Sequence, residues 1–121
     1  MAAMKSFPDD DEIQRQGCRA IGNAFFHTIN NPTIDKAMDR FVHKLNGIEL
    51  VVTVMKKFQN NALVQHGGCW VLKQLSRKQV LRDALKKRGA LSAVGEAAEK
   101  HDGDKVKLYA TVFFNNMFGN K

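Results

Sequence analysis

The chain has 121 residues, of which 44% are hydrophobic, and this suits one domain with a continuous apolar core. No stretch reaches the roughly 18 consecutive apolar residues of a membrane span, and the start Met-Ala-Ala-Met-Lys-Ser lacks the apolar core of a secretory signal. Two prolines and abundant Lys, Leu, Ala and Gln favour an all-α fold over a sheet. We therefore expect a soluble intracellular protein, cytoplasmic or nuclear, with no membrane partner.

Residues 1–8 are expected to form a flexible arm, and residues 9–121 the folded domain. The sequence Asp-Asp-Asp-Glu at 9–12 follows Pro8 and suits the start of a helix, because carboxylates there oppose the helix dipole. This helix is expected to cover 9–26. Asn-Asn-Pro within 28–33 predicts a turn, since the residue before a proline disfavours helix.

Apolar residues at helical spacing continue through the rest of the chain, and Asn or Gly residues separate the runs. About six of the predicted segments are expected to be principal helices. After the first helix they lie at 34–45, 48–58, 61–76, 78–87, 90–100 and 105–118.

The segment 61–76 is expected to organise the fold. Asn61 is a suitable N-cap, and a stripe of apolar or small residues predicts one buried face. A glycine costs a helix interior roughly 1 kcal/mol relative to alanine, so Gly67 and Gly68 indicate that another backbone approaches closely. Trp70 points away from the stripe and is expected to be partly exposed, whereas Cys69 is expected to be covered. The stripe comprises Val64, Gly68, Val71, Leu72 and Leu75.

The same stripe occurs three times. Residues 13–24 align with 64–75 at an offset of 51, and residues 106–117 align with 64–75 at an offset of 42. A period near 42 residues, with three helices in each unit, is typical of a helical solenoid. Identical pairs at the first offset are Gln14 with Gln65, Gly17 with Gly68, and Cys18 with Cys69.

The last helix of each unit has a frame of small-x-Trp-x-Leu-x-Asn type. In the three copies this frame reads Gly17, Arg19, Ile21, Asn23; then Gly68, Trp70, Leu72, Gln74; then Ala110, Val112, Phe114, Asn116. The pattern resembles the third helix of the armadillo repeat. The resemblance implies a right-handed armadillo-type helical solenoid of roughly two and a third repeats. These are a third helix at 9–26, a repeat at 34–76 and a repeat at 78–118.

The resemblance also implies a binding face. In armadillo proteins the third helices line the concave side, and the residues matching Asn23, Gln74 and Asn116 hydrogen-bond an extended peptide, unless these amides merely face water. Trp70 matches the residue that separates the peptide's side chains. Basic residues flank this amide ladder, so the expected peptide is acidic. The predicted peptide-binding residues are Arg15, Arg19, Asn23, His66, Trp70, Lys73, Gln74 and Asn116.

The C-terminal helix is more apolar than one inward face requires, and it lacks the polar cap of a terminal solenoid repeat. Three alternatives remain open. The chain is a fragment or assembly unit of a longer armadillo array, or its uncapped end self-associates into a homo-oligomer, or the Phe-rich end folds back. The predicted self-association residues are Phe113, Phe114, Met117 and Phe118.

No pattern supports catalysis, a metal or a cofactor. The histidines, at 27, 43, 66 and 101, lack ligand spacing, and no phosphate-binding glycine loop is present. Cys69 and His66 lack an orienting third group, and Cys18 and Cys69 are best explained as buried apolar residues. A basic stretch at 73–88, opposed only by Asp83, leaves charge-driven nucleic-acid binding as an alternative. The leading expectation is a non-enzymatic scaffold that binds an extended acidic segment of another protein.

Overall fold

The computed structural model describes residues 2–26, 31–101 and 103–118. Within these ranges the chain forms eight helices and no strands, so the predicted all-α class is confirmed. None of the described helices is long and apolar enough to cross a membrane. The helices are α1 (Ala2–Ser6), α2 (Asp11–Phe26), α3 (Pro32–His43), α4 (Gly47–Lys57), α5 (Ala62–Ser76), α6 (Gln79–Lys87), α7 (Ala90–Lys100) and α8 (Asp104–Met117).

The helix ends agree closely with those predicted from capping residues and apolar periodicity. Each helix from α2 to α8 begins and ends within two residues of its predicted range. Asn61 caps α5 as expected, because its Oδ1 accepts hydrogen bonds from the amides of Leu63 and Val64, both at 3.1 Å. Asn31 caps α3 in the same manner, although part of the predicted turn at 28–33 lies outside the described residues.

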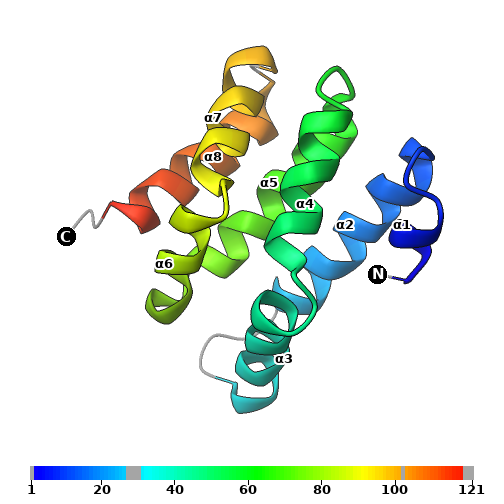
Figure 1. Ribbon diagram of the computed structural model, residues 1–121. Coiled ribbons are helices and arrows are strands. Elements are labelled where there is room, and N and C mark those ends of the chain that lie inside the picture. Colours follow the sequence, from blue (N-terminus) through cyan, green and yellow to red (C-terminus); the bar gives the residue numbers. More distant parts are fainter. Residues whose placement is uncertain (1, 27–30, 102, 119–121) are drawn as a thin grey trace.

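The helices are stacked so that α5 lies at the centre, with α2 on one side and α8 on the other (Figure 1). Helix α4 lies in front of α5 and α7 in front of α8, while α3 packs against α6 and α4 against α7. The units α3–α4–α5 and α6–α7–α8 thus repeat one order of contacts. Helices α1 and α8 lie at opposite ends of the molecule.

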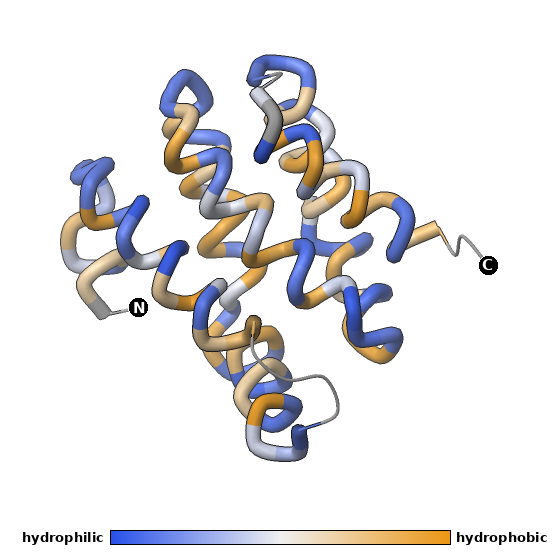
Figure 2. Tube along the Cα trace, turned by 180° about the vertical axis from the view of Figure 1, so that it is seen from behind, coloured by the Kyte–Doolittle hydropathy of each residue, from blue (hydrophilic) through white to orange (hydrophobic). Residues whose placement is uncertain are grey.

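Burial follows this arrangement. Figure 2 shows hydrophilic residues at many of the turns and hydrophobic residues along the helices between them. Helix α5 has neighbours on several sides and is therefore buried over most of its circumference. Its buried residues are Val64, Gln65, Gly67, Gly68, Cys69, Val71, Leu72, Gln74, Leu75 and Ser76.

The two glycines of α5 meet different neighbours. A Cβ at Gly67 would lie 3.0 Å from the Cβ of Cys18, with α2 backbone atoms at 3.8 Å, as the expectation of a close backbone required. At Gly68 the expectation is wrong, because the added Cβ would instead meet the Met55 side chain at 2.5 Å. Gly68 therefore makes room for a methionine from α4.

Residues 2–6 of the predicted flexible arm form helix α1, in which Met4 is only 2% exposed. A Cβ at Gly17 would lie 2.3 Å from the Met4 sulfur, so Met4 fills the space above this glycine. The side-chain Nε2 of Gln14 donates to the backbone oxygens of Met4 at 3.1 Å and Phe7 at 2.8 Å. Helix α1 has only five residues, which is too short for a helical pattern of apolar residues to be recognised in the sequence.

The same contacts recur one unit later. The Nε2 of Gln65 donates to the backbone oxygens of Met55 and Phe58, both at 2.8 Å, and these acceptors lie 10 and 7 residues before it, as they do for Gln14. Met55 packs above Gly68 as Met4 packs above Gly17. Helix α1 is thus the structural counterpart of the last turn of α4.

The C-terminal helix divides the predicted self-association residues between two faces. Phe113 and Met117 are buried with the core, so they cannot belong to an exposed patch as expected. Phe114 and Phe118 each follow one of these buried residues and lie on a neighbouring face. Phe118 is 62% exposed, and its ring stacks on that of Phe114 with the ring centres 6.2 Å apart. Residues four apart share a helix face, which explains this pairing.

Candidate functional site

A groove of about 380 Å³ runs across α2, α5 and α8, and we name it the α2–α5–α8 groove. Five of the eight predicted peptide-binding residues line it, although they come from two helices that are far apart in the sequence. The complete lining is Arg15, Arg19 and Asn23 from α2, Leu63, His66, Gly67 and Trp70 from α5, and Lys105 and Tyr109 from α8.

Helix α5 reaches the groove through one narrow strip of side chains. His66, Trp70 and Lys73 are spaced four and three residues apart, so they lie above one another on one helix face, and all three are partly exposed. Of these, His66 and Trp70 line the groove, and Lys73 lies beyond its end. The residue next to Trp70, Cys69, is completely buried. The predicted helix phase around Trp70 and Cys69 is therefore confirmed.

Tyr109 was missed by the sequence reasoning, although it holds the aromatic side of the groove together. Its ring stacks on His66 at 5.1 Å and on Trp70 at 6.2 Å, with interplanar angles of 23° and 19°. The Nζ of Lys73 lies 5.2 Å from the centre of the same ring, within range of a cation–π interaction. The repeat alignment could have identified Tyr109, because it falls at the position of Gly67, which also lines the groove.

On its other side, Trp70 packs against α2. The Phe26 ring meets Trp70 edge to face at 5.9 Å, and a Cβ at Gly22 would lie 3.0 Å from the indole. Trp70 is thus held between α2 and α8 with part of its surface open to solvent. Such an arrangement gives a rigid apolar wall for a ligand.

The charged side chains that line the groove are all basic. Arg15, Arg19 and Lys105 line it, and its lining contains no carboxylate. Arg15 is hydrogen-bonded to Glu12, its Nε lying 3.2 Å from the carboxylate. Arg19 and Lys105 have no ion-pair partner among the residues that the structure describes. The groove is therefore suited to an anionic ligand.

His66 lies within this positive field. Burial, together with the charges of Lys105 and Arg19, lowers the pKa of His66 below its usual value, so the ring is neutral at pH 7. Its Nε2 is buried and has no hydrogen-bond partner in the described part of the chain. Burial, and secondly the charge of Arg77, also lowers the pKa of Lys73. An anion in the groove would favour the charged forms of both side chains.

The predicted amide ladder does not form on this surface. Gln74 is completely buried, and its Oε1 accepts a hydrogen bond from the Arg77 guanidinium at 2.8 Å. Asn116 donates its Nδ2 to the Ser76 hydroxyl at 3.0 Å. Of the three amides only Asn23 lines the groove. The reason is that α6 and α8 close around the last turn of α5.

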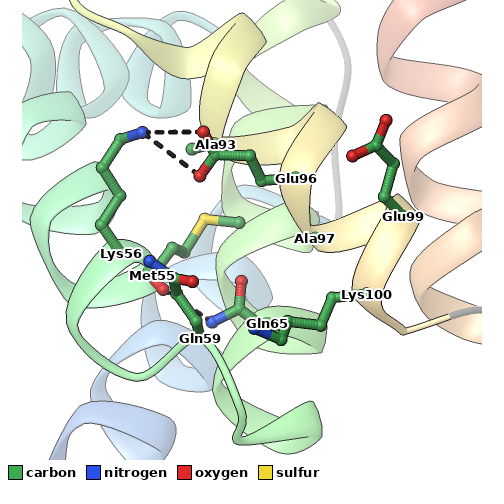
Figure 3. Close-up of a pocket in the computed structure, with 9 residues that line it drawn as sticks. All are labelled: Met55, Lys56, Gln59, Gln65, Ala93, Glu96, Ala97, Glu99 and Lys100. Carbon is green, nitrogen blue, oxygen red and sulfur yellow. Dashed lines mark hydrogen bonds and ion pairs between the residues drawn. The ribbon is translucent and has the colours of Figure 1, made fainter.

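A second hollow, of about 320 Å³, lies between α4 and α7 (Figure 3). Met55, Ala93 and Ala97 are among its apolar lining residues, and an ion pair between Lys56 and Glu96, at 3.4 Å, crosses one side. Ala93 and Ala97 align with Val51 and Met55 at the offset of 42, so smaller side chains in the last unit account for the space. Both signs of charge surround it.

Neither cysteine is an activated nucleophile. Burial raises the pKa of Cys18 and of Cys69 to about 12, and both thiols are free and covered. Within the described ranges no three His, Cys, Asp or Glu side chains gather into a possible metal-binding group, and His27 lies outside those ranges.

Comparison with known proteins finds a similarity to part of a larger protein. No family model matches the chain, and no solved structure matches it. Over 82 residues the chain is 33% identical to Protein aardvark of Dictyostelium discoideum. The match covers 66% of this chain. It covers 11% of that protein, so the chain spans about a tenth of the length of the curated relative it matches.

Proposed function

We propose that this chain is a right-handed armadillo-type helical solenoid whose activity is to bind an extended, acidic segment of a partner protein in the α2–α5–α8 groove. The order of helix contacts supports the solenoid, since three helices of one unit stack on the matching three of the next. The recurring hydrogen bonds of Gln14 and Gln65 support the same repeat.

The observation that carries the binding proposal is the composition of the groove. Two helices separated by some ninety residues supply cations to its opposite sides, α5 supplies Trp70 and His66, and no carboxylate lines it. Complementary charge speeds encounter and excludes basic segments, while the Trp70 and Tyr109 rings provide apolar contact. Asn23 adds an amide that can both donate and accept hydrogen bonds.

Single-stranded nucleic acid is the second candidate, because this groove places aromatic rings among basic side chains. Base recognition of that kind requires free ring faces. Here His66, Trp70 and Lys73 already pack on Tyr109, and Phe26 packs on Trp70. The geometry therefore favours a peptide, whose side chains and backbone can use edges and partly covered rings.

The affinity should be modest. The groove lies across three helices only and has the volume of a small ligand pocket, so it accommodates a few residues of a partner. We expect dissociation constants no better than micromolar, corresponding to about −8 kcal/mol.

The test is a titration of an acidic peptide, a basic peptide of equal length and a single-stranded oligonucleotide. Arg19→Gln and Lys105→Gln should each weaken binding of the acidic peptide several-fold. Lys36→Gln removes the same charge from an exposed site on α3 and should leave binding unchanged. Preference for the basic peptide, or equal effects of all three substitutions, would refute the proposal. Tighter binding of the oligonucleotide with a steep salt dependence would favour the second candidate.

A further inference from the structure

Several hydrogen-bond donors of the α2–α5–α8 groove lie around His66, and their arrangement is more specific than the binding of an acidic peptide requires. His66 is one of the α5 residues that line the groove, and its buried Nε2 has no partner among the described residues. A buried polar atom without a partner is uncommon and costs free energy. A ligand atom that hydrogen-bonds this nitrogen, after a turn of the His66 ring toward the groove, would remove that cost.

Two basic side chains without an ion-pair partner in the described ranges flank the same histidine. Arg19 reaches the groove from α2 and Lys105 from α8, so they stand on opposite sides of the α5 strip. Both lie close enough to His66 for their charges to affect its protonation. Neither one forms an ion pair within the described ranges, whereas Arg15 nearby is bound to Glu12.

This arrangement distinguishes among anions by shape and charge. A carboxylate presents two oxygens in one plane and carries one negative charge. A phosphate monoester presents three oxygens in different directions and carries between −1.5 and −2 charges at pH 7. Donors that approach from two opposite helices and from the floor between them match the phosphate better, and an arginine fork binds two of its oxygens at once.

We propose that the groove is a phosphopeptide site, in which a phosphoserine or phosphothreonine of the partner segment binds between Arg19 and Lys105 with one oxygen accepting a hydrogen bond from His66. This inference rests on the proposed function, since it specifies which residue of the acidic segment occupies the centre. The two cations are exposed at the rim, so a short phosphorylated side chain is long enough to reach them.

Binding of a phosphate should also change the pKa of His66. In the free protein its pKa is lowered by burial, Lys105 and Arg19. Tyr109 on α8 stacks on the His66 ring, Arg15 on α2 lines the same groove, and Lys73 on α5 contacts the Tyr109 ring. A bound dianion opposes the effect of these cations, so the pKa of His66 should rise on binding and a proton should be taken up.

The experiment uses three acidic peptides that differ only at one central position, which is Ser, Glu or phosphoserine. They are titrated at pH 7 into the wild-type chain, Arg19→Gln, Lys105→Gln and the control Lys36→Gln. We expect the phosphopeptide to bind about tenfold more tightly than the Ser peptide, with the Glu peptide between them. Each groove substitution should remove most of this gain, and Lys36→Gln should remove none.

The outcomes separate the two proposals. If the Ser and Glu peptides bind but phosphorylation gives no gain over Glu, the phosphate inference is wrong and the proposed function stands. If none of the three peptides binds, both are wrong. A phosphate gain that survives both groove substitutions places the phosphate elsewhere and overturns the inference. So does tighter binding of an oligonucleotide than of the phosphopeptide.

A measurement independent of the variants is an NMR titration of the His66 ring. Its pKa should rise on addition of the phosphopeptide and change less with the Ser peptide. An unchanged His66 pKa in the phosphopeptide complex would contradict direct contact between the phosphate and this ring.

Discussion

Replacing Gln65 by methionine tests whether the buried glutamine holds α4 against α5. Methionine has a similar volume, so Gln65→Met removes two hydrogen bonds without opening a large cavity. The acceptors are the backbone oxygens of Met55 and Phe58, each at 2.8 Å from the glutamine Nε2. Met55 lies in the last turn of α4, where carbonyl oxygens lack partners within the helix.

The expected cost follows from these contacts. Each bond contributes about 1 kcal/mol net, and a buried carbonyl left without a donor costs about 1–3 kcal/mol. The Phe58 oxygen still accepts a bond from the Asn61 amide at 3.0 Å, so Met55 bears most of the penalty. We therefore expect Gln65→Met to lower the free energy of unfolding by about 2–3 kcal/mol.

Urea unfolding followed by circular dichroism measures this loss. Lys107 occupies the aligned position in the last unit but is exposed, so Lys107→Met is the matched control and should change the free energy by less than about 0.5 kcal/mol. Gln14→Met should have a smaller effect than Gln65→Met, because α1 has only five residues. Equal effects of Gln65→Met and Lys107→Met would refute this account of the repeat's internal support.

Three other predictions address different parts of the molecule. Phe118→Ser should reduce concentration-dependent self-association, measured by light scattering with size exclusion at about 100 μM, because Phe118 is 62% exposed; a wild-type monomer at that concentration would contradict it. Ala97→Met should fill the hollow between α4 and α7 and raise the free energy of unfolding by about 1 kcal/mol, whereas Ala98→Met, outside that lining, should not. Thiol reagents at pH 8 should label Cys18 and Cys69 far more slowly in the native chain than in urea, because both side chains are buried and burial raises the pKa of both thiols to about 12; rapid labelling of the native chain would show that one is exposed.

The sequence alone determined the helices and the phase of α5. Caps such as Asn61 and apolar periodicity act within a few residues, so they specify where a helix begins and which face is buried. They also indicated that Trp70 is partly exposed while Cys69 is covered. The repeat alignment also predicted that Arg19 and His66 lie on the same surface, and both line the groove.

The tertiary structure alone decided how much of each helix stays open. Gln74 follows Trp70 by one turn, yet it is completely buried near the end of α5, against which α6 and α8 pack. Tyr109 and Lys105 became groove residues because α8 packs beside α5, some forty residues away in the chain. A local pattern gives the direction in which a side chain points. It does not contain the neighbours that pack beside the helix, and these decide whether the side chain meets solvent, a ligand or the core.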